Sequence, residues 1–162
     1  MKKIFVATAA LLLFSIILTS CGANVPRPEI KEGRFNISVP YEHNGEIKTV
    51  SGVYVCEYEG VNWWDINADP YANWKEGYEG DIQDDGIIPI CKTDDGGEIF
   101  ISFLLYPEYF MGDPEYANYT PLIRAELWYA DEQTDDIERI AEHGVKLISY
   151  ECDEPIENTF KL

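Results

Sequence analysis

Residues 34–58, RFNISVPYEHNGEIKTVSGVYVCEY, predict a β-hairpin on which the rest of the fold can be built. From Phe35 to Tyr41 apolar residues alternate with polar ones, which is the period-two pattern of a strand with one buried face. A second strand-like run extends from Glu46 to Tyr58, after His43-Asn44-Gly45. Because Asn-Gly between two such runs is a strong turn signal, we expect the runs to pair antiparallel.

The turn allows two registers. A three-residue loop, His43–Gly45, puts Gly45 in the left-handed conformation and adds a bulge. A two-residue Asn44-Gly45 loop instead places Tyr41 opposite Lys48. We favour the three-residue loop because it aligns the apolar faces of the two strands. It pairs Glu42 with Glu46, Tyr41 with Ile47, Val39 with Thr49 and Phe35 with Val53.

Strand-like runs recur along the rest of the chain. Pro89 lacks an N–H and marks its run as an edge strand, whereas the nearly continuous apolar run 98–106 fits a central strand covered on both faces. Residues 60–85 are the least regular part and are long for a connection, so we expect a long loop there that is functional or carries short strands. The predicted strands after this loop are 87–92, 98–106, 122–130, 145–152 and 156–160.

One helix of about nine residues is expected between the last strands, with Thr134 as its N-cap and Gly144 at its end. Many short strands with turns between them and one short helix predict a mainly β fold, an antiparallel immunoglobulin-like β-sandwich. The Cys-Trp-Cys spacing of a true immunoglobulin domain is missing. An α+β sheet and an open barrel are the alternatives.

The N-terminal stretch, Met1 to Cys21, has a different character. Lys2 and Lys3 precede an apolar run from Ile4 to Leu18. As a helix this run would span roughly 22 Å, which is short of the roughly 30 Å of a bilayer core. It therefore fits a secretory signal better than a membrane span.

The apolar run closes with Leu18-Thr19-Ser20-Cys21. This segment, and only this segment, resembles the signal peptide and lipobox of bacterial lipoproteins. The resemblance implies that the chain is cut before Cys21 and that the Cys21 thiol carries a diacyl lipid, which anchors the protein to the membrane outside the cytoplasm, at the cell surface or in the periplasm. It divides the chain into a signal peptide (1–20), a lipidated tether (21–33) and a single β-rich extracytoplasmic domain (34–162).

The charge excludes nucleic acid as a partner. Residues 21–162 hold all thirty carboxylates and ten of the twelve Lys and Arg, a net charge of −20. Such a domain repels phosphate backbones and anionic lipid headgroups. With eleven Tyr, seven Phe and four Trp in the chain, we expect an acidic surface over an aromatic core rather than a disordered chain, and we place Trp128 in that core.

Three cysteines besides Cys21 are available in an exported domain, where disulfides can form. Cys56, Cys91 and Cys152 allow three single pairings, each of which leaves one thiol over. The three cysteines can equally be unpaired, small buried apolar residues, and the sequence does not decide between a disulfide and free thiols. Since no CxxC is present, neither a zinc site nor a redox centre is predicted.

A calcium site is one hypothesis for the irregular segment. Asp65, Asn67, Asp69 and Glu76 occupy positions 1, 3, 5 and 12 of an EF-hand-like loop. Pro70 stands at position 6, where that loop needs Gly for its sharp turn, so the match is partial. The alternative is a solvated acidic loop. Ca²⁺ is the one cofactor that the sequence suggests.

An aromatic binding surface is the second hypothesis for the same segment. Aromatic faces beside carboxylate and amide groups suit a glycan or a protein ligand. The candidate contacts are Trp63, Trp64, Tyr71, Trp74 and Tyr78.

Enzyme chemistry has little support, because neither a nucleophile motif nor a phosphate loop occurs. The sequence thus favours a membrane-anchored extracytoplasmic binding or adhesion domain, with the Trp-rich acidic loop as its ligand site. The alternatives are a calcium-stabilised structural domain and a hydrolase that uses paired carboxylates.

Overall fold

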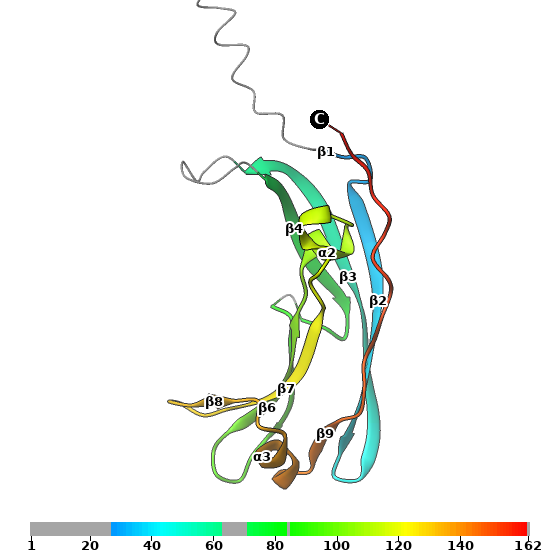
Figure 1. The fold of residues 1–162 in the computed structure, drawn as a ribbon. Helices are drawn as coiled ribbons and strands as arrows, with labels where there is room; N and C mark the ends of the chain where they lie inside the picture. The colour runs from blue at the N-terminus through cyan, green and yellow to red at the C-terminus, as the bar shows by residue number, and fades with distance from the viewer. Residues whose placement is uncertain (1–26, 63–70, 84, 162) are drawn as a thin grey trace, which may run out of the picture.

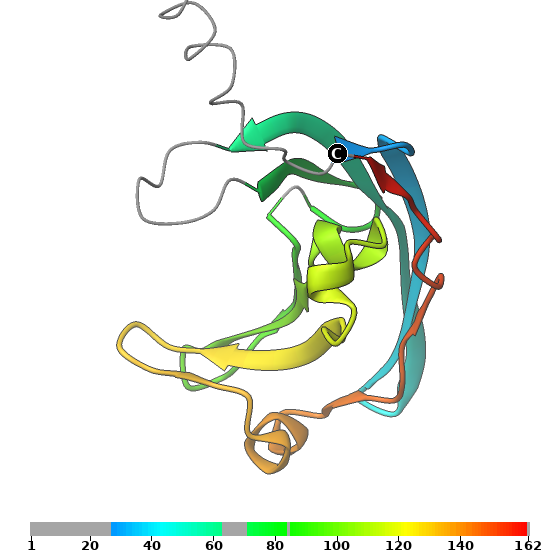
Figure 2. The ribbon, with the colours of Figure 1, turned by 45° about the horizontal axis from the view of Figure 1, so that its top comes forward.

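The computed structural model describes residues 27–62, 71–83 and 85–161. Within them the chain is mainly β, and two antiparallel sheets pack against each other with short helices between and beside them (Figure 1). The predicted antiparallel β-sandwich is confirmed. β2, β3 and β4 form a meander in the first sheet, and β5 to β8 form a meander in the second. The chain then returns through α3 to the first sheet, where β9 and β10 pair with β2 (Figure 2).

The first sheet is built on the hairpin that opens the sequence analysis. Its strand order is β10-β2-β3-β4, and β9 pairs with the same edge of β2 as β10 does. The strands are β2 (Glu32–His43), β3 (Glu46–Asn62), β4 (Tyr71–Gly80), β9 (Val145–Leu147) and β10 (Glu151–Cys152).

The second sheet has the order β5-β6-β7-β8. As Pro89 predicts, β5 is an edge strand, and its pairing with β6 shifts register between Pro89 and Cys91. β6 lies inside the sheet, as its apolar run predicts. The strands are β5 (Ile87–Lys92), β6 (Glu98–Leu104), β7 (Leu122–Trp128) and β8 (Gln133–Thr134).

A third, two-stranded ladder joins β1 (Arg27–Pro28) to β11 (Phe160–Lys161). β1 and the start of β2 lie within residues 21–33, the predicted tether. The paired structure therefore begins at Arg27, earlier than residue 34, because the C-terminal segment supplies a partner strand that periodicity alone does not reveal.

The predicted register of the hairpin is wrong. His43 pairs with Glu46 and Tyr41 with Lys48, so the turn has two residues. Asn44 and Gly45 both have positive φ, 54° and 81°, as a type I′ turn requires, and such a turn matches the right-handed twist of the strands. Val39 then lies opposite Val50 and Phe35 opposite Tyr54, and all four side chains are buried.

The predicted long loop at 60–85 is wrong as well. β3 and β4 form a long hairpin that occupies most of this segment, and only residues 63–70 between them lie outside the description. A register shift between Tyr58 and Gly60 bends β3, and Gly60 has a φ of 122° that a side chain would disfavour.

The core fills the space between the two sheets. Phe35 and Tyr54 of the first sheet contact Phe110, with ring centroids 4.8 and 5.4 Å apart. Phe110 ends the short helix α2 (Pro107–Phe110), which lies between the sheets (Figure 2). From the second sheet Ile101 and Phe103 complete the same cluster.

The helical segments differ in part from the prediction. α3 (Ile137–Glu142) begins two residues later than expected, because Asp136 rather than Thr134 accepts the capping hydrogen bonds from the N–H groups of residues 138 and 139. Gly144, with a φ of 75°, follows its end. α2 and the 3₁₀ helix η1 (Pro114–Tyr116) were expected as loop.

The predicted strand 145–152 is split into β9 and β10, and residues 148–150 between them are outside the ladder. Among the described helices, none is long and apolar enough to cross a membrane.

Candidate binding surface

The structure separates the aromatic residues that the sequence groups into one surface. Trp63 and Trp64 lie outside the described residues. Trp74 is only 8% exposed and packs edge-on against Tyr58 at 5.4 Å. Tyr78 is half-buried against Tyr54 and Phe103. Trp74 and Tyr78 therefore belong to the core side of β4 and are not surface ligand contacts.

Tyr71 alone among the described members of that group is well exposed, at 44%. It lies at the start of β4, and its hydroxyl accepts a hydrogen bond from the side chain of Asn62 at 2.9 Å. The core positions were missed because Gly77 and charged residues between them hide a period-two pattern in β4.

Of the four residues in the calcium hypothesis, Glu76 is the one that the structure describes. Asp65, Asn67 and Asp69 lie outside the described residues. Glu76 accepts a 2.5 Å hydrogen bond from the hydroxyl of the buried Tyr54. In the described part of the chain, no three His, Cys, Asp or Glu side chains are grouped to hold a metal ion. The EF-hand-like site stays a prediction.

Cys21, the predicted lipidation site, also lies outside the described residues. Cys56, Cys91 and Cys152 are free thiols. Burial raises the pKa of Cys56 to about 12 and that of Cys152 to about 11, so both are protonated at neutral pH. A protonated buried thiol is a poor nucleophile and a poor metal ligand.

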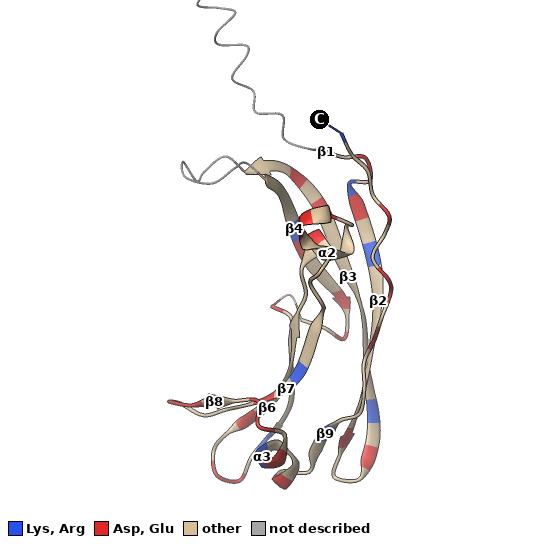
Figure 3. Cartoon of the chain, in the orientation of Figure 1, with Lys and Arg blue, Asp and Glu red and all other residues tan. Residues whose placement is uncertain are grey.

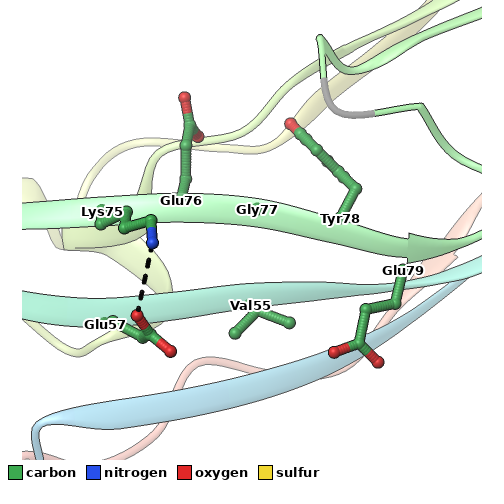
Figure 4. A pocket seen from close by; sticks show the side chains of 7 residues that line it. All are labelled: Val55, Glu57, Lys75, Glu76, Gly77, Tyr78 and Glu79. Atoms are coloured by element: carbon green, nitrogen blue, oxygen red, sulfur yellow. Dashed lines mark ion pairs between the residues drawn. The ribbon is translucent and has the colours of Figure 1, made fainter.

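A shallow groove of about 180 Å³ crosses β3 and β4 where Gly77 has no side chain (Figure 4). Figure 4 shows Glu76 and Tyr78 pointing to one side of β4, while Lys75 and Glu79 lie on the other side with Glu57 of β3. Most charges in this groove are paired: Lys75 lies 3.9 Å from Glu57, and Glu79 pairs with Arg34. The remaining charged group, Glu76, accepts the hydrogen bond from Tyr54.

The outer face of β7 holds a buried carboxylate. Glu126 is 2% exposed and accepts hydrogen bonds from Arg124 Nε (2.6 Å), Trp128 Nε1 (2.7 Å) and Gln133 Nε2 (2.7 Å). Arg124 also donates to Asp135 at 2.9 Å. Burial alone would raise the pKa of Glu126, but the hydrogen bonds from Trp128 and Arg124 lower it overall.

Trp128 was expected in the core and is only partly buried. It lies on the face of β7 opposite the core residue Leu127, with its ring 4.9 Å from that of Phe100.

Glu126 accepts hydrogen bonds from three protein side chains, so we assign it a structural role. It holds Trp128 and Arg124 in position and, through Gln133, ties β8 to β7. A carboxylate held ionised in this way is a poor general acid.

A second group of aromatic residues is exposed where the sequence analysis expected only a loop. Tyr106 and Tyr119 are 37% and 46% exposed, with ring centroids 5.0 Å apart. Tyr116 lies 5.0 Å from Tyr119. Leu104 and Leu122, paired neighbours on β6 and β7, are 41% and 44% exposed. We call Leu104, Tyr106, Tyr116, Tyr119 and Leu122 the tyrosine surface.

The tyrosine surface continues into an apolar groove of about 320 Å³, because Leu122 belongs to both. The groove runs between β7, α3 and β9. Ile137 at its margin is 76% exposed, whereas Ile140 of the same helix is 2% exposed. Three charged residues, Arg124, Asp135 and Lys146, also line the groove. Its apolar lining is formed by Leu122, Ile123, Ala125, Ile137, Ile140, Val145 and Leu147.

The sequence contains a signal for this surface. Residues 106–119, YPEYFMGDPEYANY, contain four tyrosines in a stretch rich in turn-forming residues. Aromatic residues in such a segment are candidates for exposure. Whether they contact one another depends on α2 and η1, which the sequence did not predict.

Comparison of the chain with models of protein families, with curated proteins and with solved structures found no match.

Proposed function

We propose that this chain is a membrane-anchored extracytoplasmic binding domain that holds a protein partner on its tyrosine surface. The observation that carries the proposal is the exposure of Tyr106 and Tyr119, whose rings contact each other, beside the exposed Leu104 and Leu122; the partly buried Tyr116 ring packs against Tyr119. Contiguous exposed apolar groups are unusual on a monomer and are typical of interaction sites.

Tyrosine suits this role for physical reasons. Its ring buries a large area at a low cost in side-chain entropy, and its hydroxyl can still hydrogen-bond at a wet interface. The groove next to Leu122 offers a partner a place to bury a large apolar side chain, which is how the strongest contacts of most interfaces are built. Protein recognition therefore explains the surface and the groove together.

The membrane anchor is proposed from the sequence of residues 1–21. If Cys21 carries the lipid, the five residues 22–26 separate it from β1 at Arg27, a reach of about 20 Å. β1 lies at one end of the domain and α3 at the other (Figure 1). This arrangement favours a domain whose β1 end is near the membrane and whose apolar groove is directed away from it.

Site-specific photo-crosslinking in living cells tests the binding surface. A photoreactive amino acid replaces Tyr119 in one full-length variant and Tyr71, which is equally exposed, in a matched control. We expect a discrete, protease-sensitive adduct from position 119 and none from position 71. Equal adduct patterns from the two positions, or no adduct from position 119, would contradict the proposal.

A product at position 119 that resists protease but is removed by glycan-degrading enzymes would replace the protein partner by a glycan. The anchor has its own test, because mass spectrometry of the processed protein should find a diacylated N-terminal Cys21. A free thiol at that position would remove the anchor from the proposal and leave the binding surface untouched.

A further inference from the structure

The charges around the tyrosine surface are acidic. Residues 93–123, which carry the whole surface, contain no Lys or Arg. Glu115 directly precedes Tyr116, whose N–H donates a 3.0 Å hydrogen bond to the backbone carbonyl oxygen of Asp113. Burial raises the pKa of Tyr116, and so do the charges of Glu108, Tyr119, Asp113 and Glu115. In the described part of the chain none of the three carboxylates forms an ion pair with Lys or Arg.

The backbone holds these acidic residues together, because the N–H of Asp113 donates to the carbonyl oxygen of Glu108 at 2.9 Å and the Asp113 carboxylate accepts from the N–H of Glu115 at 3.0 Å. Burial raises the pKa of Glu108, and the neighbouring Asp113 and Glu76 raise it further. Some acidic groups elsewhere in the described part of the chain have cationic partners: Glu79 pairs with Arg34, for example. Figure 3 shows the few basic positions scattered singly among the acidic ones. A partly buried group of like charges without a counter-ion is stabilised when a cation approaches it.

We propose that the partner presents a basic segment to the tyrosine surface, with Lys or Arg side chains interspersed with large apolar ones. This inference rests on the proposed function and names the chemistry of its partner. The cations pair with Glu108 and Glu115 and stack on the tyrosine rings, which attract cations through their electron-rich faces. An apolar side chain of the segment enters the groove beside Leu122.

A binding measurement with defined peptides tests this. The processed full-length protein is held in nanodiscs of phosphatidylcholine, whose zwitterionic surface does not attract a basic peptide. The probe is a fluorescent peptide of alternating Arg and Trp, followed by anisotropy, and peptides of alternating Arg and Ser and of alternating Glu and Trp are compared with it. We expect the Arg-Trp peptide to bind at least about tenfold more tightly than either of the others.

Matched variants distinguish peptide binding at the tyrosine surface from the general electrostatic attraction of a basic peptide to an acidic protein. We expect the double variant Glu108→Gln with Glu115→Gln to weaken Arg-Trp binding by about tenfold, and Tyr119→Ser to weaken it to a similar extent. The control is Glu138→Gln with Glu142→Gln on α3, two exposed residues whose exchange changes the net charge by the same amount. It should change affinity by less than about twofold, and added salt should weaken binding to the unsubstituted protein.

Equal losses in the two double variants would overturn the inference, since attraction would then follow net charge alone. Tight binding of the Glu-Trp peptide would overturn it too. If position 119 gives its crosslink in cells while no basic peptide binds, the basic partner is wrong and the binding domain stands. If position 119 gives no crosslink in cells, the proposed function is contradicted, and the inference of a basic partner loses its basis.

Discussion

The hydroxyl of Tyr150 donates a 3.0 Å hydrogen bond to the backbone carbonyl oxygen of Pro121. This contact ties the C-terminal segment, which runs beside the first sheet, to the residue that precedes β7 of the second sheet. Pro121 is next to Leu122 and two residues from Tyr119, so the bond fixes one margin of the tyrosine surface.

Replacement of Tyr150 by Phe should therefore lower the free energy of unfolding by about 0.5–1.5 kcal/mol, because one hydrogen bond between two segments is lost. Tyr119→Phe is the matched control, since its hydroxyl has no hydrogen-bond partner in the described part of the chain, and it should stay within about 0.5 kcal/mol of the unsubstituted protein. Urea denaturation measures both. An equal effect of the two substitutions would mean that the Tyr150 bond contributes nothing to stability.

The Glu126 network should be more costly to break. Glu126→Ala leaves the donors of Arg124, Trp128 and Gln133 without their acceptor, and we expect a loss of about 1–3 kcal/mol. Glu142→Ala on the exposed face of α3 is the control and should change stability by less than about 0.5 kcal/mol. The indole fluorescence of the Glu126 variant should also shift, because Trp128 loses its hydrogen bond. A Glu126→Ala protein as stable as the control would show that the network is not structural.

Stability should fall in alkali. Burial, and then the hydrogen bond to Glu76, raise the pKa of Tyr54 far above its ordinary value of 10.0. The unfolded chain releases this proton near pH 10 while the folded protein retains it, so the stabilisation is complete below that pH and is lost as pH rises above it. Cys56 acts in the same direction above its ordinary pKa of 9.0.

Melting temperatures measured between pH 7 and pH 11 test this, with Tyr54→Phe as the second variant. That variant loses the hydrogen bond to Glu76 and should be less stable at pH 7, yet its melting temperature should decline less from pH 9 to pH 11. Parallel curves for the two proteins would contradict the assignment of the alkaline loss to Tyr54.

Calcium should leave the melting temperature unchanged. A ligand that binds only the folded state must stabilise it, so millimolar Ca²⁺ would raise the melting temperature if the EF-hand-like site were formed. The Glu76 carboxylate already accepts a hydrogen bond from Tyr54, and Pro70 stands where the loop needs Gly. A rise with Ca²⁺ that a chelator reverses, and that Glu76→Gln abolishes, would restore the calcium hypothesis.

The sequence predicts the hairpin well and its register poorly, for identifiable reasons. The alternation of apolar and polar residues from Phe35 to Tyr41 predicts a strand, whichever register that strand takes with the next one. The two registers differ by one residue, and each brings apolar side chains together, so hydrophobic pattern does not separate them. Asn44 has a positive φ, as the two-residue type I′ turn requires. This turn is favoured because it matches the twist of the two strands, which the hydrophobic pattern does not encode.

The candidate site was harder to predict than the fold. Trp74 follows an acidic stretch, which favoured an exposed loop, but its strand pairs with β3 and turns the indole into the core. Tyr116 and Tyr119 were expected in a loop, but Tyr116 ends η1, and this 3₁₀ turn brings the two rings into contact. Contacts that depend on short helices without a periodic pattern are beyond sequence reasoning.

The most direct test of the account is tyrosine labelling in cells. A reagent small enough to reach the periplasm but unable to cross the cytoplasmic membrane is applied to intact cells and to the purified processed protein, and mass spectrometry compares labelling at each tyrosine. The account predicts that Tyr71 is labelled equally in both, while Tyr106 and Tyr119 are protected in cells. Equal labelling of Tyr119 in both samples would contradict the binding surface, and an unlabelled Tyr71 in cells would contradict the location outside the cytoplasm.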